Sequence, residues 1–234
     1  MEVIVRRVLV LGMLFATIGT GCVSGSVGVY GDSNIALNGT MPVATYGDRV
    51  RDQIAQLHEV VTFEPGPGKT QSTHPLNARL SSVSSGGFPT AADGTIDAVV
   101  IGLGTNDAVD FVYGNPTGYP VQSAVYQAGF YLERAAQSGA KCVVWILPNE
   151  INPYIVDDAQ RAAASDYIRV FNGYLNGLPR TLEMVSGTAQ FRTIDWGTAA
   201  FWTPNLSFDR MHPNAAGADY LGAQIRNTVG ECIR

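Results

Sequence analysis

Two short runs in the middle of the chain are almost continuously apolar, and they constrain the fold more than any other feature. Residues 98–101 read Ala-Val-Val-Ile, and residues 143–147 read Val-Val-Trp-Ile-Leu. A strand with one face in water alternates apolar and polar residues, whereas a strand covered on both faces does not. The sequence therefore predicts a parallel sheet between two layers of helices. Five strands are expected, at residues 26–30, 59–63, 97–103, 141–147 and 191–195.

Helical patterns separate the predicted strands. They cover residues 44–57, 121–137, 158–176 and 214–229. Strands that alternate with helices favour right-handed crossovers, and hence an α/β fold: a three-layer α/β/α sandwich around a five-stranded parallel sheet. The chain has no visible repeat or long linker, and 46% of its residues are apolar while 15% are charged. This composition suits one globular domain over residues 22–234.

The first 21 residues have the pattern of an export signal peptide. Arg6 and Arg7 precede an apolar run over residues 8–18, and small residues then lead to Cys22. The run is too short to span a bilayer comfortably. A cysteine after small residues also resembles a bacterial lipoprotein cleavage site, but Gly19 stands where a Leu-like residue is usual. Lipidation of Cys22 and ordinary secretion both stay open, and either makes the mature chain secreted or attached to the cell envelope.

The other two cysteines are Cys142 and Cys232. An even pair in an oxidising compartment favours a disulfide. Cys142 opens a predicted strand, and Cys232 ends a helix that should run antiparallel to it, so both fall at the same end of the sheet. A Cys142–Cys232 disulfide is the prediction, and two unpaired thiols are the alternative.

Two polar blocks directly follow predicted strands, at the edge where parallel sheets bind ligands. Ser33 follows the first strand in Gly31-Asp32-Ser33-Asn34, and Asn106 follows the third in Gly104-Thr105-Asn106-Asp107. A serine hydroxyl there is a candidate nucleophile, and a neutral side-chain amide is suited to holding an oxyanion. Each block alone is also an ordinary turn sequence.

A third block, near the C-terminus, supplies a base. Asp209 and His212 stand three residues apart before Pro213, so the carboxylate can meet Nδ1–H and leave Nε2 to accept a serine proton. Of the other histidines, His58 precedes the second strand at the opposite sheet edge, and His74 lies in a loop without a nearby acid partner. His212 is therefore the best-supported base, with Asp209 to orient it.

Together, the three blocks resemble the most diagnostic blocks of the SGNH/GDSL hydrolase family. They span residues 31–213, which is nearly the whole mature domain. The resemblance implies a flavodoxin-like α/β/α fold, ester hydrolysis, and no metal or organic cofactor.

The resemblance also implies an oxyanion hole built from the Ser33 backbone N–H, a glycine N–H and the Asn106 side chain. The loop after the second strand points to Gly68 as that glycine, with Gly66 as second choice. The letters GDSL in the family name stand for Gly-Asp-Ser-Leu, whereas this chain has Asn34 in the place of the Leu. That position is variable in the family and has no catalytic role.

These residues predict an exported serine esterase that hydrolyses carboxylic esters (short-chain, lipid or acetylated glycan) through an acyl-enzyme. Two alternatives stay open: an acyltransferase with the same site, and a non-catalytic envelope protein that binds glycan or lipid. A net charge of -5 and a pI near 5.1 argue against a nucleic-acid partner. We expect a monomer.

Three long loops, at residues 105–120, 148–156 and 196–211, are expected to line the substrate site. Their aromatic residues fit an acyl or sugar site and packing between the loops equally well: Phe111, Tyr113, Tyr119, Tyr154, Phe201 and Trp202.

Overall fold

The structure is a computed structural model that describes residues 25–35, 46–66, 68–77, 96–116, 118–184 and 187–234. The predicted signal peptide at residues 1–21 and Cys22 lie outside these ranges and stay predictions. Among the helices in these ranges, none combines the length and the apolar character that crossing a membrane requires.

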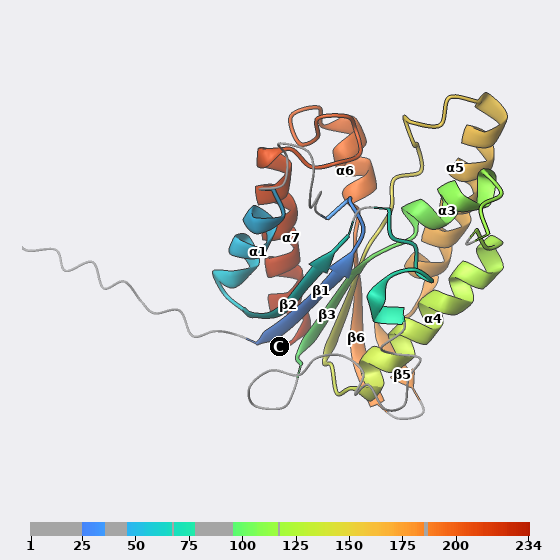
Figure 1. Cartoon of the computed structure of the whole chain (residues 1–234). Coiled ribbons are helices and arrows are strands. Elements are labelled where there is room, and N and C mark those ends of the chain that lie inside the picture. Colours follow the sequence, from blue (N-terminus) through green and yellow to red (C-terminus); the bar gives the residue numbers. More distant parts are fainter. Residues whose placement is uncertain (1–24, 36–45, 67, 78–95, 117, 185–186) are drawn as a thin grey trace, which may run out of the picture.

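A six-stranded sheet runs through the centre of the molecule (Figure 1). Its strands, in the spatial order β2-β1-β3-β4-β6-β5, are β1 Ser26–Gly31, β2 Glu59–Pro65, β3 Ala98–Gly102, β4 Cys142–Ile146, β5 Thr181–Met184 and β6 Gly187–Ile194. Neighbouring strands are parallel except β5, which is antiparallel to β6. All five predicted strands are present and parallel to one another. The prediction of a purely parallel five-stranded sheet is nevertheless wrong, because the sheet is mixed and has a sixth strand.

The sixth strand, β5, is a four-residue strand at the edge of the sheet. It forms a hairpin with β6, in which Thr181 pairs with Gln190. Because residues 187–190 pair with β5 in this hairpin, β6 begins at Gly187, ahead of the predicted start at residue 191. Four residues are too few to leave a periodic signal in the sequence.

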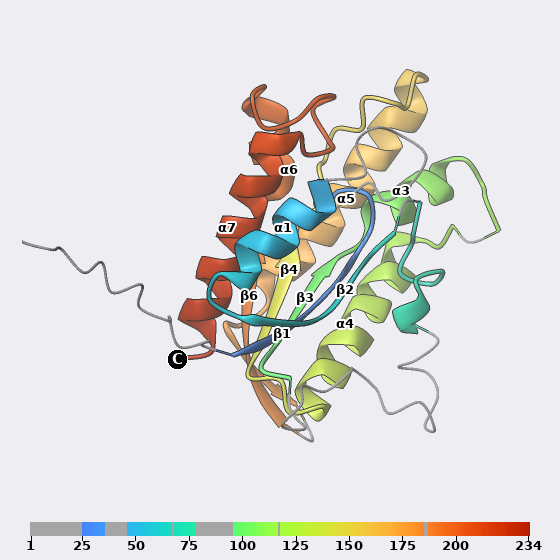
Figure 2. The ribbon, with the colours of Figure 1, turned by 60° about the vertical axis from the view of Figure 1, so that its left-hand side comes forward.

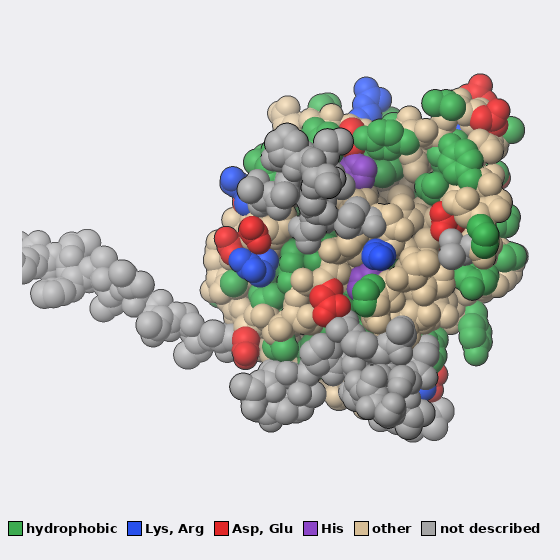
Figure 3. Space-filling model, viewed as in Figure 1, with side chains coloured by type: hydrophobic (Ala, Val, Ile, Leu, Met, Phe, Trp, Pro, Cys, Tyr) green, Lys and Arg blue, Asp and Glu red, His purple; other side chains and the backbone are tan. Residues whose placement is uncertain are grey.

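Helices cover both faces of the sheet (Figure 2). On one face lie α1 Tyr46–Ala55, α6 Trp196–Trp202 and α7 Ala215–Cys232. On the other lie α3 Thr105–Val112, α4 Val121–Gln137 and α5 Asp158–Gly177. The four predicted helices are present, and the three-layer arrangement is the predicted one. Charged side chains of both signs are interspersed over the face drawn in Figure 3.

Two of the predicted loops contain helices instead. α3 begins at Thr105 and occupies the first half of the predicted loop 105–120, and α6 begins at Trp196 in the predicted loop 196–211. Asp195 caps α6 by accepting a hydrogen bond from the Thr198 N–H at 3.0 Å. Both helices are shorter than the window over which helical periodicity can be recognised, so the loop prediction was wrong there.

The apolar runs in β3 and β4 are explained by burial on both faces. Val99 and Ile101 pack beneath α4 and α5, whereas Ala98 and Val100 pack beneath α1 and α7. All four side chains are fully buried. Alternate residues of one strand thus serve two separate cores, and no position in the strand favours a polar residue.

A disulfide joins Cys142, at the start of β4, to Cys232, at the end of α7, with their Cα atoms 5.6 Å apart. It ties the last helix to the centre of the sheet at the end opposite the polar blocks. The two residues are 90 apart in sequence, so the bond closes a long loop in the unfolded chain.

We expect the double variant Cys142→Ala/Cys232→Ala to lower the free energy of unfolding by about 2–5 kcal/mol, because the unfolded chain regains loop entropy. Thermal unfolding should move down by roughly 5–15 °C. The wild-type protein in reducing agent is the matched control and should unfold near the same temperature as the variant. A wild-type midpoint that reducing agent leaves unchanged would contradict a stabilising disulfide.

Candidate active site

Ser33 occupies the turn that follows β1, at the carboxyl edge of the sheet. The Asp32 N–H donates to the Gly102 carbonyl at the end of β3, at 2.9 Å, and the Ile35 N–H closes the turn on the Asp32 carbonyl at 3.2 Å. Ser33 itself is half-buried. The backbone of the serine is therefore fixed while its hydroxyl remains reachable.

Two facing glycines allow the ends of β1 and β3 to come this close. Gly31 and Gly102 pair in register. A Cβ on Gly31 would lie 2.8 Å from the Gly102 carbonyl oxygen, and one on Gly102 would lie 2.7 Å from the Ile35 Cδ1. A larger residue at either position would push the strand ends apart and displace Ser33.

A tight turn before α7 carries Asp209 and His212. It is closed by a bridge between Ser207 and Pro213. Asp209 Oδ1 accepts the N–H groups of Met211 at 2.9 Å and His212 at 2.7 Å. Its other oxygen, Oδ2, lies 2.5 Å from His212 Nδ1. Three hydrogen bonds thus fix the carboxylate relative to the imidazole.

This turn reaches back over the sheet edge to Ser33. His212 Nε2 lies 3.0 Å from Ser33 Oγ, although the residues are 179 apart in sequence. The structure therefore brings Ser33, His212 and Asp209 into one hydrogen-bonded chain. Such a chain can pass the serine proton to the imidazole while the carboxylate stabilises the resulting cation.

The carboxyl of Asp209 is held in its charged form. Burial raises its pKa, but hydrogen bonds from the His212 side chain, from Tyr154 and from the His212 backbone outweigh burial and lower the pKa to about 2. The stability from these bonds is complete above the ordinary pKa near 3.8 and is lost as the pH falls towards 2. Asp209 is therefore an anion wherever His212 can act as a base.

Two aromatic side chains flank His212. The Tyr154 hydroxyl donates to Asp209 Oδ2, the oxygen that also faces His212 Nδ1. Burial and this bond raise the pKa of Tyr154 to about 12, so the hydroxyl keeps its proton. Phe208 stacks on the imidazole with ring centroids 5.7 Å apart. The sequence left the role of Tyr154 undecided and gave no reason to single out Phe208 beyond its position next to Asp209.

Residues from two other loops anchor the turn. Trp196 Nε1 donates to the Met211 carbonyl at 3.1 Å, and Asn149 Nδ2 donates to the Arg210 carbonyl at 3.0 Å. Arg210 has a φ of 68°, which is unfavourable for a residue with a side chain. The bond from Asn149 helps to hold that conformation. Sequence patterns could not reveal these anchors, because each contact is made across the fold.

Asn34 has a structural role that the sequence did not suggest. Its N–H donates to Asp32 Oδ1 at 2.8 Å, and its Nδ2 donates to Thr105 Oγ1 at 2.5 Å. Because Thr105 is the first residue of α3, this buried amide ties the Ser33 turn to α3.

α3 in turn holds the loop that follows β2. Asn106 Nδ2 donates to the Lys69 carbonyl at 3.1 Å, and both oxygens of Asp107 accept the Gln71 N–H at 3.1 Å. Asn106 Nδ2 also lies 3.5 Å from Asp32 Oδ2, which is long for a hydrogen bond. One amide N–H of Asn106 is thus well placed to turn towards a ligand.

The loop held by α3 contains both candidate glycines. The Gly66 N–H donates to the Gly31 carbonyl at 2.8 Å and so continues the pairing of β1 with β2. Gly68 lies beyond that pairing, with a φ of 65°, next to the residue that Asn106 binds. Since the N–H of Gly66 is engaged, Gly68 is the better candidate of the two.

Asp32, next to Ser33, is a buried carboxyl with 1% of its surface exposed. Burial raises its pKa to about 8, against the lowering effect of the Asn34 N–H. It therefore keeps its proton at neutral pH. An uncharged neighbour does not oppose negative charge that develops near Ser33.

Each of the other two histidines has a backbone carbonyl as a hydrogen-bond partner. His58 Nε2 lies 2.9 Å from the Arg226 carbonyl, and His74 Nε2 lies 2.9 Å from the Glu64 carbonyl. Both are buried, as structural histidines are. In the described part of the chain, no group of three or more His, Cys, Asp or Glu side chains is arranged to hold a metal ion.

The loop aromatics divide between the two roles that the sequence left open. Phe111 packs against Tyr167, with ring centroids 5.5 Å apart. Tyr119 lines a cavity between α4 and the loop after β2. Phe201 and Trp202 line a cavity of about 300 Å³ beside the Asp209–His212 turn.

Solved structures with this fold include esterases and lipases. The acetylxylan esterase Axe2 from Geobacillus stearothermophilus is 17% identical, with 90% of this chain and 96% of that chain covered and a TM-score of 0.53. The lipase Lip_vut3 from a goat rumen metagenome is 19% identical, with 87% and 96% covered and a TM-score of 0.56. An aryl esterase from M. smegmatis is 14% identical, with 89% and 99% covered and a TM-score of 0.55.

No protein-family model and no curated protein matches the chain. At these identities the solved structures establish the fold, which extends over almost the whole of each compared chain. These solved structures share the layered α/β fold that the sequence predicts.

Replacing Tyr154 with Phe should make the protein less stable in acid. Without the Tyr154 hydroxyl, Asp209 loses one of the hydrogen bonds that lower its pKa, so its pKa rises and the stability that depends on its charged form is lost at a higher pH. We expect the midpoint of acid unfolding, followed by circular dichroism, to move up by roughly 0.2–0.5 pH unit. Tyr220→Phe, at a half-exposed position on α7, is the matched control. A midpoint unchanged in Tyr154→Phe would exclude this coupling.

Proposed function

We propose that this chain is an exported serine esterase that hydrolyses carboxylic esters. The observation that carries the proposal is the continuous hydrogen-bonded chain from Ser33 Oγ to His212 Nε2 and from His212 Nδ1 to Asp209 Oδ2. A nucleophile, a base and an orienting carboxylate are the groups that acyl transfer requires, and here they share one sheet edge. Fold neighbours that are esterases and lipases support the same reaction class.

In the first half of the reaction, Ser33 Oγ attacks the ester carbonyl carbon and its proton passes to His212 Nε2. Asp209 remains ionised and stabilises the imidazolium. The tetrahedral intermediate collapses as the C–O bond to the alcohol breaks, and His212 returns the proton to the leaving oxygen. The acyl group is then esterified to Ser33.

The negative charge on the carbonyl oxygen needs hydrogen-bond donors. We assign this role to the Ser33 N–H, the Gly68 N–H and Asn106 Nδ2. The bond between Asn106 and the Lys69 carbonyl supports the assignment, because it holds the side chain and the Gly68 loop together. The neutral state of Asp32 favours the same charge. Water, deprotonated by His212, then attacks the acyl-enzyme and releases the acid.

Export rests on the sequence alone, through the signal pattern at residues 1–21 and the possible acylation of Cys22. An exported esterase would meet envelope lipids, acetylated polysaccharides or external esters as substrates. Transfer of the acyl group to a sugar hydroxyl in place of water uses the same residues. Product analysis in the presence of an added glycan distinguishes hydrolysis from such transfer.

The decisive measurement is hydrolysis of p-nitrophenyl acetate, butyrate and octanoate by the wild-type protein and by Ser33→Ala. We expect wild-type turnover and a loss of about 10⁴-fold or more in the variant, because Ser33 Oγ is the group proposed to carry the acyl group. Ser123→Ala, at an exposed position on α4, is the control and should keep full activity. A wild-type protein that hydrolyses none of the esters and leaves a serine-directed phosphonate unreacted would instead favour a non-catalytic binding protein.

Asn106→Ala should lower kcat by roughly 10²–10³ with little change in KM, since an oxyanion donor acts mainly in the transition state. Asn106 also donates a hydrogen bond to the Lys69 carbonyl, so its loss could destabilise the fold. The unfolding temperature of the variant is therefore measured together with its kinetics. A near-normal kcat in a folded variant would refute the oxyanion role.

A further inference from the structure

Ser33 and Asn106 lie in segments that are far apart in sequence, yet the proposed reaction needs them at one fixed separation. Ser33 follows β1, whereas Asn106 is the second residue of α3. The oxyanion forms on the carbon that Ser33 Oγ attacks. A donor that is misplaced by about 1 Å relative to the serine therefore loses much of its effect. The reaction thus depends on what holds α3 relative to the serine turn.

The start of α3 is not fixed by a side-chain cap of its own. Its N-cap residue is Gly104, which has no side chain that could accept from the first N–H groups of the helix. By contrast, α5, α6 and α7 each begin with a side-chain cap, from Asp157, Asp195 and Asn214. Gly104 also has a φ of 129°, so the chain turns sharply just before the helix. α3 therefore takes its position from contacts with other segments.

Two contacts hold this region without reaching the first turn of α3. The Asp32 N–H donates to the Gly102 carbonyl, at the end of β3, at 2.9 Å. At the other end of the helix, Phe111 packs against Tyr167 of α5, with ring centroids 5.5 Å apart. The first contact locates the strand, and the second locates the last turn of the helix. Neither contact joins the first turn of α3 to the turn that carries Ser33.

Asn34 makes the contact that joins them. It directly follows Ser33, and its side chain is buried. Its Nδ2 donates to Oγ1 of Thr105, the first residue of α3, at 2.5 Å. Its own N–H donates to Asp32 Oδ1 at 2.8 Å, which holds its backbone in the serine turn. The bond between Asn34 and Thr105 thus links the immediate neighbours of Ser33 and Asn106.

Stability alone does not explain an asparagine at this position. Its Oδ1 is buried and has no hydrogen-bond partner among the described residues. A buried carbonyl oxygen without a donor destabilises the folded state, and an apolar side chain avoids that penalty. The contribution of Asn34 is therefore to be sought in the bond that its Nδ2 makes across the site.

We propose that Asn34 is a positioning residue, which holds Thr105 so that Asn106 is aligned with Ser33 to stabilise the oxyanion. The inference rests on the proposed esterase function. The Asn34 side chain is buried and binds Thr105, so it acts through α3 and not on the ester. Its loss should leave substrate binding nearly intact and weaken an interaction that is made mainly in the transition state.

The test removes the bond from each side, in Asn34→Leu and in Thr105→Val. In both variants, kcat for p-nitrophenyl acetate should fall about 10–100-fold, with KM within about twofold of the wild-type value. The loss should be the same for p-nitrophenyl butyrate, because both esters form the same oxyanion. Thr105→Ser keeps the acceptor oxygen and should restore kcat to within about threefold of the wild-type value. If Asn34→Leu does not fold, Thr105→Val takes its place throughout.

A double-variant cycle decides whether the effect passes through Asn106. In the Asn106→Ala background the oxyanion donor is already absent. Adding Asn34→Leu should therefore lower kcat by less than about twofold more, instead of by the full factor seen in the wild-type background. A change that merely loosens the serine turn would lower kcat by the same factor in both backgrounds.

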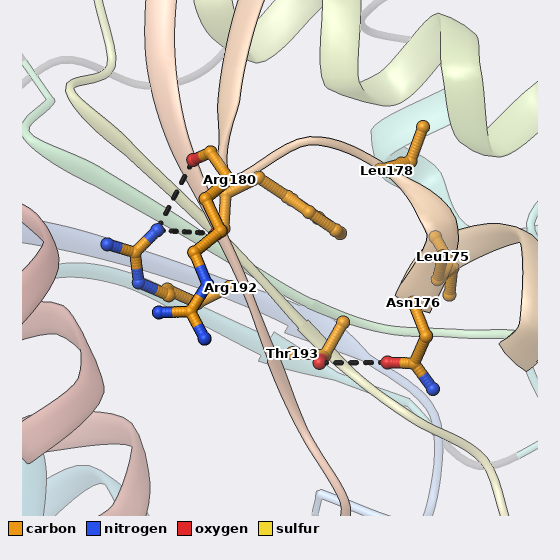
Figure 4. A pocket seen from close by; sticks show the side chains of 7 residues that line it. Leu175, Asn176, Leu178, Arg180, Arg192 and Thr193 are labelled. Atoms are coloured by element: carbon orange, nitrogen blue, oxygen red, sulfur yellow. Dashed lines mark hydrogen bonds between the residues drawn. The ribbon is translucent and has the colours of Figure 1, made fainter.

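The chain offers a matched control on another strand. Figure 4 shows a second hydrogen bond between a threonine and an asparagine, which Thr193 Oγ1 of β6 donates to Asn176 Oδ1 of α5 at 3.1 Å. β6 is separated from β1 by β3 and β4 in the sheet. Thr193→Val removes this bond and should keep the wild-type kcat.

Three results would overturn the proposal. They are a kcat in Thr105→Val within about threefold of the wild-type value, an equal loss in Thr193→Val, and a full additional loss from Asn34→Leu in the Asn106→Ala background. Each leaves the esterase function standing as long as the wild-type protein hydrolyses the esters and Ser33→Ala does not. A wild-type protein that hydrolyses none of them contradicts the esterase function, and the role of Asn34 falls with it.

Discussion

The close approach of the ends of β1, β2 and β3 is the constraint on which the rest of the site depends. Gly31 lies between Pro65 and Gly102 in register, and backbone hydrogen bonds continue across all three strands just past their ends. Those bonds set where Ser33 begins its turn. They also set where the segments begin that carry Asn106, in α3, and Gly68, in the loop after β2. Without side chains on the facing glycines, these three segments can come close together at one edge of the sheet.

The number of hydrogen-bond donors decides which carboxyl groups at this edge are charged, because burial raises the pKa of all of them. Asp32 and Asp107 receive few donors, so burial dominates and raises their pKa values to about 8 and about 7. Asp209 receives two backbone N–H groups, a tyrosine hydroxyl and the imidazole, which together lower its pKa to about 2. At neutral pH, Asp209 is therefore an anion on the far side of His212 from Ser33, whereas Asp32 beside Ser33 keeps its proton. That distribution suits a reaction in which the oxygen near Ser33 must become an anion.

The turn that carries His212 also borders a cavity that Asn149 and Phe201 line. Asn149 and Phe201 contact Arg210 on one side, and Asp209 and His212 lie on either side of it in sequence. The wall of that cavity and the residues that orient the base thus belong to one connected part of the structure. Contacts from two other parts of the chain therefore hold a short segment that has an unusual backbone conformation at Arg210.

The sequence by itself determined the layered α/β fold, five of the strands, the longer helices and the candidate residues Ser33, Asn106, Asp209 and His212. These follow from hydrophobic periodicity and from the rule that loops at the carboxyl ends of parallel strands meet. Tertiary structure alone decided the antiparallel β5, the short helices α3 and α6, and the contacts of Tyr154, Phe208 and Asn34. The physical reason is that a hydrophobic period can be recognised only over many consecutive residues. A four-residue strand, or a single hydrogen bond between loops far apart in sequence, depends instead on which surfaces the folded chain brings together.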